Sequence, residues 1–228
     1  MKSTKDNLQV LFEDNHIIIV NKRPGDITQG DRTGDQPLSE IVKAYIKEKY
    51  NKPGQVYLGV VHRLDRPTSG IIIFARTSKA LERLNKMLRE KTIRKTYWAV
   101  VKNQPRKNKE TLIGFLKKNP KNNKSTAYNK EITGSKKAIL HYKILKQLDN
   151  YALLEIDLET GRHHQIRCQL ASIGSPIKGD LKYGFNRSNK DGSIHLHARK
   201  INFTHPVRKE NIEITAAPPN EVIWQACT

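Results

Sequence analysis

The stretch from His62 to Ala75 constrains the fold of this chain more than any other part of its sequence. It begins with the polar nonapeptide His-Arg-Leu-Asp-Arg-Pro-Thr-Ser-Gly, in which the carboxylate of Asp65 stands between two arginines. The turn-forming Pro-Thr-Ser-Gly leads directly into the apolar run Ile-Ile-Ile-Phe-Ala, which is typical of a buried strand. Because functional side chains are often carried by loops on a rigid scaffold, the pattern predicts a site loop in which neighbouring cations keep Asp65 ionised.

The charge of the chain is strongly unbalanced. Lys and Arg number 42 against 22 Asp and Glu in 228 residues, which gives a formal net charge of +20. Such an excess attracts polyanions over long distances, and nucleic acid is the commonest partner of a chain like this. A basic membrane-surface protein, or a basic surface without a specific partner, is the alternative. We therefore expect a nucleic acid as the partner.

The sequence does not favour a membrane or a secreted protein. Its longest aliphatic runs, Ile17 to Val20 and Ile71 to Ala75, are far shorter than the roughly 20 residues that span a bilayer. The stretch from Met1 to Asn7 is polar and lacks the apolar centre of a signal peptide. Cys168 and Cys227 do not form a disulfide framework. We expect a cytoplasmic protein.

Hydrophobic patterning predicts an α+β fold with a mixed, largely antiparallel central sheet flanked by helices, because strands outnumber helices and several are joined as hairpins. One helix begins with Pro37 in its first turn and ends before Asn51, and a second is capped by Ser78. A third lies within 160–174, with Ile166, Leu170 and Ile173 buried and Gly174 just past its end. The expected strands cover 10–12, 17–20, 71–75, 96–101, 139–148, 151–158, 196–203 and 212–215.

One segment, 106–137, differs from the sequence around it. It holds nine Lys and one Arg against two Glu, a net charge of 10 − 2 = +8, and is interrupted by Asn, Gly and Pro. We expect a mobile basic hairpin or insertion that contacts phosphates, the alternative being a solvated loop without a function. With no long linker elsewhere, the chain is expected to be a single domain over 1–228, without a separate N-terminal RNA-binding module.

Two further segments carry residues suited to a site. The first reads Thr-Gly-Arg-His-His-Gln-Ile-Arg at 160–167 and is followed by Gly179-Asp180 and Tyr183-Gly184. The guanidinium of Arg167, at the margin of the expected helix core, could orient a carboxylate through two parallel hydrogen bonds. The second is the strand sequence Arg-Lys-Thr-Tyr-Trp-Ala-Val-Val at 94–101, in which Tyr97 and Trp98 point to opposite faces.

These segments, in this order, resemble the motifs of the RluA-type pseudouridine synthases, and the resemblance covers the chain from about Leu8 to Pro219. It implies the pseudouridine synthase catalytic fold with a cleft across the sheet, no cofactor, and RNA as the partner. It also implies that Asp65 is the catalytic residue, that Tyr97 contacts the target base and that Arg167 pairs with Asp65. At two places the chain departs from the family pattern: Arg23-Pro24 replaces Pro-Ala, and His163 replaces Thr.

The same resemblance gives the expected substrate-binding residues. Arg63 is the candidate that stabilises a uridine flipped out of its stem or loop, and His62 is expected to position the site rather than act as a general base. Ribosomal RNA is favoured over transfer RNA, and a monomer is expected. The full set of expected substrate-binding residues is Arg63, His62, Arg162, Gln165 and Arg66.

The sequence is also compatible with other functions. A non-catalytic RNA-binding or ribosome-assembly protein would share the basic surface without needing Asp65, Tyr97 and Arg167 together. A glycosidase or nucleic-acid glycosylase usually places two carboxylates about the scissile bond, and no second acid stands near Asp65 in the sequence. A metal site is not expected, because nothing resembles paired Cys-x-x-Cys spacing. The residues that could otherwise suggest a metal are His163, His164, Cys168, His195 and His197.

Overall fold

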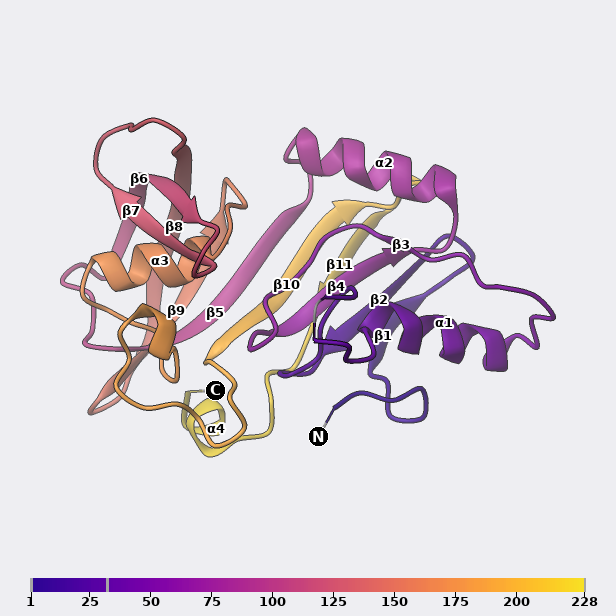
Figure 1. The fold of residues 1–228 in the computed structure, drawn as a ribbon, viewed down its shortest axis with the longest axis horizontal. Helices are drawn as coiled ribbons and strands as arrows, with labels where there is room; N and C mark the ends of the chain where they lie inside the picture. The colour runs from indigo at the N-terminus through magenta and orange to yellow at the C-terminus, as the bar shows by residue number, and fades with distance from the viewer. Residues whose placement is uncertain (1, 32, 228) are drawn as a thin grey trace. The chain divides into compact units, whose positions relative to one another are not determined.

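The computed structural model describes residues 2–31 and 33–227. It divides into two compact units, each assembled from two stretches of chain. The first unit comprises 1–95 and 198–219, and the second comprises 96–197 and 220–228. The elements of both are labelled in Figure 1.

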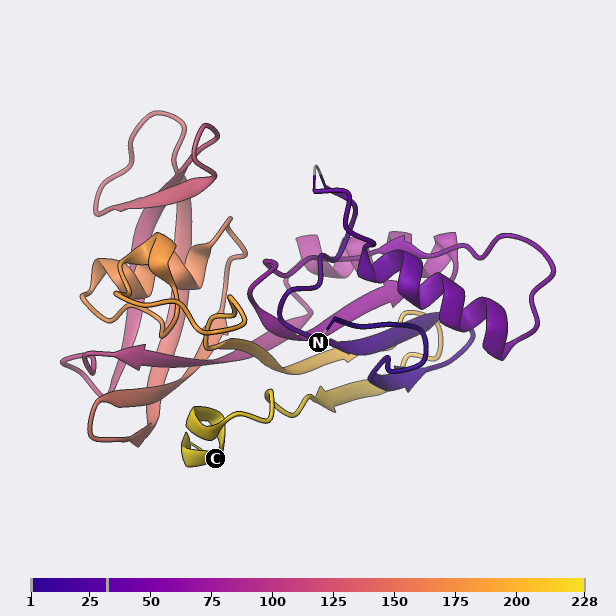
Figure 2. The same ribbon diagram turned by 60° about the horizontal axis from the view of Figure 1, so that its bottom comes forward.

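The first unit is built on an antiparallel arrangement of strands with two helices. Strand β2 (Ile17–Lys22) lies between β1 (Val10–Glu13) and β4 (Ser69–Ala75), and the two-residue β3 (Gly59–Val60) pairs with the end of β4. Strand β10 (Leu196–Thr204) follows β4 in the strand order and pairs with β11 (Asn211–Thr215). The helices are α1 (Leu38–Lys49) and α2 (Ser78–Arg89), which Figure 2 shows from a second side.

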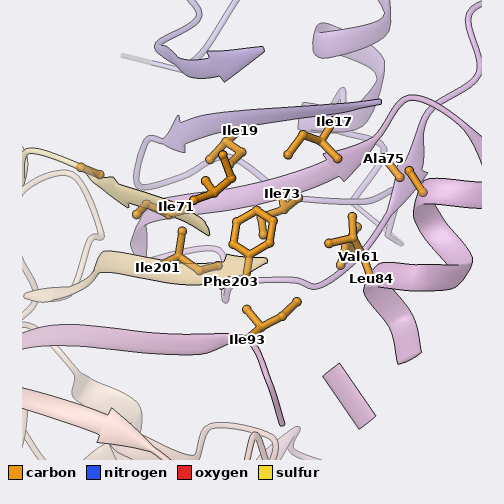
Figure 3. Packing of buried hydrophobic residues seen from close by; sticks show 13 residues of the cluster. Ile17, Ile19, Val61, Ile71, Ile73, Ala75, Leu84, Ile93, Ile201 and Phe203 are labelled. Carbon is orange, nitrogen blue, oxygen red and sulfur yellow. The ribbon is translucent and has the colours of Figure 1, made fainter. Parts of the chain in front are cut away.

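Strands β2 and β4 are apolar at successive positions because both of their faces are buried. Alternate side chains of a strand point to opposite faces, and here each face packs in a different cluster. Ile71 and Ile73 pack with α2 and with Phe203 of β10, as Figure 3 shows for the strand residues, whereas Ile72 and Phe74 pack with α1. Burying such side chains stabilises the fold by about 1.5–3 kcal/mol each, so β4 is a rigid support for the loop before it.

The second unit is an antiparallel sheet in the order β5-β9-β8-β6-β7. Helix α3 packs on one face of it through a cluster of Leu116, Ala138, Cys168 and Tyr183, and Trp224 of α4 packs against Val100 and Leu153 in another cluster. The strands are β5 (Arg94–Lys102), β6 (Lys109–Asn119), β7 (Lys124–Tyr128), β8 (Lys136–Gln147) and β9 (Tyr151–Leu158), and the helices are α3 (Gln165–Ser172), the 3-10 helix η1 (Leu181–Tyr183) and α4 (Val222–Cys227).

The expected α+β class, strands and helices are confirmed, with local corrections. Thr77, not Ser78, caps α2, because its hydroxyl accepts the N–H of Ala80 at 3.1 Å. Pro37 is the residue before α1 rather than part of its first turn. Ile173 is 37% exposed, so it does not belong to the core, whereas Gly174 follows α3 with φ +82° as expected. Strand β3 and helix α4 were not predicted.

The basic segment 106–137 contains the expected hairpin, formed by β6 and β7 around a turn at 120–123. It is also part of the sheet, because β6 pairs with β8 along eight register positions from Lys109 to Leu116. Of its lysines, Lys117, Lys118 and Lys121 are exposed near the turn. Its role in binding phosphate stays a prediction, as does the single-domain assignment.

Within residues 2–31 and 33–227, the structure contains no helix that is long and apolar enough to cross a membrane. Cys168 and Cys227 are both buried free thiols.

Candidate active site

The loop that carries Asp65 connects β3 to β4 and closes with a short turn. The N–H of Thr68 donates to the carbonyl of Asp65 at 3.0 Å. At the start of β4, Gly70 has φ +114°, and a Cβ atom there would lie 2.4 Å from backbone atoms of Ala198 in β10. Only glycine allows this approach and this φ angle. The prediction of a loop leading directly into a buried strand is therefore confirmed.

The buried side chain of Lys22 anchors this loop through its backbone carbonyls. Lys22 is 1% exposed, and its Nζ donates to the carbonyls of Arg23 at 3.0 Å, Arg66 at 3.1 Å and Thr68 at 2.7 Å. An ammonium has three donors, so these three acceptors satisfy it completely. Burial lowers the pKa of Lys22 to about 7, although the nearby carboxylates of Asp26 and Asp65 act to raise it. Lys22 thus bonds to two residues of the Asp65 turn, Arg66 and Thr68, a role that its sequence context did not indicate.

The replacement Lys22→Met tests this anchor. Because the folded pKa is about 7 and that of the unfolded chain is about 10.4, the unfolded state holds the extra proton between these pH values. The free energy of unfolding of the wild type should therefore rise relative to that of Lys22→Met as pH increases from 7 to 10. Urea unfolding of both proteins at each pH measures the difference, and a constant difference would contradict the buried, pKa-shifted amine.

The other predicted residues of this loop have different surroundings. Arg66 pairs with Asp35, which also accepts a hydrogen bond from Lys2 at 2.7 Å, whereas Arg63 is exposed. His62 accepts the N–H of Ile73 on its Nε2 at 3.2 Å. Burial, together with the charge of Lys95, lowers the pKa of His62 to about 3. An imidazole with this low pKa, whose Nε2 already accepts a backbone N–H, is a weak base, and the positioning role of His62 stays a prediction.

Tyr97 lies on β5 in the second unit, opposite Ile156 of β9. It is 6% exposed, whereas its neighbour Trp98 packs against the cluster that contains Trp224. The two aromatic side chains thus belong to opposite faces of the strand, as expected. The contact of Tyr97 with a target base stays a prediction.

The Gly-Arg loop before α3 is fixed by the side chain of Gln165. Its Oε1 accepts hydrogen bonds from the hydroxyl of Thr160 at 2.8 Å and from the N–H of Arg162 at 3.0 Å. Its Nε2 donates to the carbonyl of Ile139 at 3.0 Å. Gln165 is 3% exposed, so its surroundings favour a structural role, while Arg162 is exposed and donates from Nε to the carbonyl of Lys137 at 2.9 Å.

Arg167 is buried in α3 rather than at the margin of the core, and it forms an ion pair with Asp180. Its Nε donates to one carboxylate oxygen of Asp180 at 2.7 Å and its Nη2 to the other at 2.8 Å. The Arg167 side chain is 6% exposed and that of Asp180 is 1% exposed. This two-pronged geometry fixes the plane of the guanidinium. The pairing of Arg167 with Asp65 stays a prediction.

The residues that could suggest a metal site have other contacts. The Sγ of Cys168, one helical turn after His164, donates to the carbonyl of Ser125 at 3.3 Å. Burial raises the pKa of that thiol to about 11, whereas metal ligation needs a thiolate. His195 stacks on the ring of Trp224, with centroids 5.3 Å apart. In the part of the chain that the structure describes, no group of three or more His, Cys, Asp or Glu is arranged to hold a metal ion.

Sequence reasoning missed two buried charged residues of the candidate site, Lys22 and Asp180. Both residues were noted only as members of motifs, Asn21-Lys22-Arg23 and Gly179-Asp180, and were given no partner. A buried lysine and a buried aspartate need partners. The weak signal was that Lys22 follows the apolar run Ile17 to Val20 and that Asp180 follows the turn residue Gly179.

Comparisons with known proteins identify the family. The sequence model of the RNA pseudouridylate synthase family matches residues 16–172. The chain is 38% identical over 218 residues to a ribosomal large subunit pseudouridine synthase C of Buchnera aphidicola, covering 92% of this chain and 67% of that protein. It is 33% identical over 216 residues to an uncharacterized RNA pseudouridine synthase of Synechocystis, covering 93% of this chain and 66% of that protein. The chain spans about two thirds of the length of these relatives.

The fold agrees with that of solved structures. A human RNA pseudouridylate synthase domain-containing protein 4 superimposes with a TM-score of 0.79 at 21% identity, covering 95% of this chain and 90% of the other. Human RNA pseudouridylate synthase domain-containing protein 1 gives a TM-score of 0.76 at 20% identity, covering 100% and 90%. At these identities the likeness concerns the fold alone. The matched sequence model and the curated relatives identify the chain as a member of the RNA pseudouridylate synthase family, of the RluA type that its motifs predicted.

Proposed function

We propose that this chain converts uridine to pseudouridine in ribosomal RNA and that Asp65 is its catalytic carboxylate. The observation that carries the proposal is the construction of the Asp65 loop. Its turn is held by hydrogen bonds from the Nζ of Lys22, and the segment after it reaches the backbone of β10 at Gly70. A carboxylate fixed in this way, in a member of this family, is preorganised to act on a bound nucleotide.

The reaction breaks the bond between C1′ of ribose and N1 of uracil, turns the base, and forms a bond between C1′ and C5. The hydrogen on C5 leaves as a proton and N1 gains one, so the reaction needs no oxidant, reductant or energy source. A carboxylate can serve by attacking C1′ as a nucleophile or by removing a ribose proton as a base. In either role Asp65 must be ionised, and the proposal includes Arg167 as its partner and Tyr97 as the residue against the base.

The proposal favours ribosomal RNA because relatives that are 38% and 30% identical to this chain are named ribosomal large subunit pseudouridine synthases C and D. A uridine in a stem or loop must first be flipped out, which costs a few kcal/mol. Arg63 is exposed beside Asp65, so it is the candidate that stabilises the flipped state. We keep transfer RNA as a second substrate class, and a cytoplasmic monomer as the expected form of the protein.

The test is tritium release from RNA labelled at C5 of uracil. Isomerisation must free this hydrogen, whereas RNA binding or hydrolysis of the glycosidic bond does not. Wild-type protein should release tritium from unmodified ribosomal RNA, and mapping pseudouridine in the product would locate the target. Tight RNA binding without release, from both naked RNA and partly assembled subunits, would instead support a binding or ribosome-assembly protein.

The basic hairpin gives a separate prediction about RNA affinity. The triple variant Lys117→Glu, Lys118→Glu, Lys121→Glu reverses three exposed charges near the β6–β7 turn. Each lost phosphate contact should reduce the slope of log K against log salt by about 0.7–0.9. Filter binding at several salt concentrations measures this slope. The control Lys47→Glu, Lys52→Glu changes exposed lysines at the end of α1 and should keep the slope of the wild type. A hairpin variant whose slope equals that of this control would exclude a phosphate contact at the hairpin.

A further inference from the structure

Ser125, on β7 of the basic hairpin, has all of its polar groups engaged. It is 2% exposed, and its N–H donates to the Oη of Tyr183 at 2.8 Å. Its carbonyl accepts from the Sγ of Cys168 at 3.3 Å, and its hydroxyl lies between two atoms of His163. Ser125 therefore links the hairpin by hydrogen bonds to α3, to η1 and to the loop before α3.

The hydroxyl of Ser125 determines the proton position on His163. It donates its single hydrogen to the carbonyl of His163 at 2.8 Å, because a carbonyl can only accept. The same oxygen lies 3.0 Å from Nδ1 of His163. In this arrangement Nδ1 must carry a hydrogen and donate it to the serine. The two residues thus exchange two hydrogen bonds, which lock both the backbone and the ring of His163.

The ring of His163 in turn supports a strained residue. It stacks on His164 with ring centroids 3.8 Å apart and an angle of 24° between the planes. His164 precedes α3 with φ 53° and ψ 29°, a left-handed conformation that costs a non-glycine residue about 1–2 kcal/mol. Its Nδ1 lies 2.9 Å from the Oη of Tyr183. The stack and this hydrogen bond hold His164, and with it the first turn of α3, in place.

The same cluster reaches both the hairpin and Arg167. Burial raises the pKa of Tyr183 to about 12, so its phenol stays neutral. The Nζ of Lys124 lies 5.3 Å from the centre of the Tyr183 ring, and the Cζ of Arg167 lies 5.1 Å from it. In addition, Lys182 donates to the carbonyls of Asn122 and Asn123 in the hairpin turn, both at 3.3 Å.

We propose that His163 is a positioning residue which, through Ser125 and His164, holds the basic hairpin and the first turn of α3 in a fixed arrangement for RNA. We call Ser125, His163, His164 and Tyr183 the histidine clasp. This inference rests on the proposed function, since the clasp joins lysines expected to contact phosphate to the helix that carries Arg167. Loss of the hydrogen bonds between Ser125 and His163 should weaken productive RNA binding more than it slows the chemical step.

The test compares His163→Asn with His163→Leu. The two replacements have nearly the same size and shape, but only asparagine offers an N–H in place of Nδ1–H. We expect the KM for RNA to rise about tenfold in His163→Leu and by less than about threefold in His163→Asn, with kcat changed less than KM. Ser125→Ala should match His163→Leu, and the double variant Ser125→Ala/His163→Leu should be no worse than either single one.

Amide hydrogen exchange gives a readout that does not depend on activity. The N–H of Ser125 should exchange faster in His163→Leu than in the wild type, and as slowly as in the wild type in His163→Asn. If the wild-type enzyme releases no tritium, the proposed function fails while the exchange data still test the clasp. An active wild type with equal KM values and equal exchange rates in both variants would overturn the clasp alone.

A matched control is His141, on β8. His141 is partly exposed and lies 2.8 Å from the hydroxyl of Thr111 through its Nδ1, so it also has a hydroxyl partner. His141→Leu should leave the KM for RNA and the exchange of Ser125 unchanged. A rise in KM equal to that of His163→Leu would show a general loss of sheet stability and would overturn the specific role of His163.

Discussion

Asp65→Asn should reduce tritium release by about 10⁴-fold or more while RNA affinity and thermal stability stay near those of the wild type. Asparagine has the size of aspartate, so the turn held by Lys22 should persist. Its neutral amide can neither attack C1′ nor take a ribose proton. The effect should appear in single-turnover experiments with saturating enzyme, which measure the chemical step rather than product release.

The matched control for this prediction is Asp149→Asn. Asp149 is exposed in the turn between β8 and β9, so its variant should retain full turnover. Binding of unmodified RNA to Asp65→Asn should be measured in parallel. Turnover of Asp65→Asn within tenfold of the wild type would show that another group carries the reaction.

Arg167→Leu should lower the free energy of unfolding by about 3–5 kcal/mol, because it leaves the buried carboxylate of Asp180 without its guanidinium partner. Urea unfolding at pH 7 measures this loss. The double variant Arg167→Leu/Asp180→Leu removes both charges, and buried ion pairs can often be replaced by apolar pairs at little cost. The double variant should therefore recover much of the lost stability.

Activity separates the structural role of Arg167 from its proposed catalytic one. If Arg167 also orients Asp65, the stable double variant should remain at least 100-fold slower than the wild type. Recovery of both stability and turnover would show that Arg167 serves the fold alone. A single Arg167→Leu variant as stable as the wild type would contradict the energetic role of its pair with Asp180.

The strands and the site loop could be predicted because their signals are local. The runs Ile17 to Val20 and Ile71 to Ala75 are short, apolar and bounded by turn residues, and the structure buries both faces of each. Gly174 marked the end of α3 for the same local reason, since a left-handed residue there favours glycine. Two-residue β3 and six-residue α4 are too short to produce a periodic pattern.

The missing parts of the site depend on contacts between residues far apart in the sequence. Lys22 bonds to carbonyls about 45 positions away, and Asp180 pairs with a residue 13 positions away. Hydrophobic periodicity contains no information about such partners. The cap of α2 illustrates a smaller ambiguity: Thr77 and Ser78 are both good capping residues, and only the position of the Ala80 N–H distinguishes them.

The place of β7 at the end of the strand order has a consequence for solubility. Among the described residues of the second unit, β7 pairs with no strand but β6. The N–H and carbonyl of Ser125 are bonded to Tyr183 and Cys168, so only the part of this edge beyond Ser125 could join an edge of another molecule. Lys124 stands within this edge strand, and Lys121 and Lys130 flank it. Lysines on an edge discourage such pairing. The hairpin charge would then protect the RNA-free protein from self-association, and concentrated salt, by screening it, should promote aggregation.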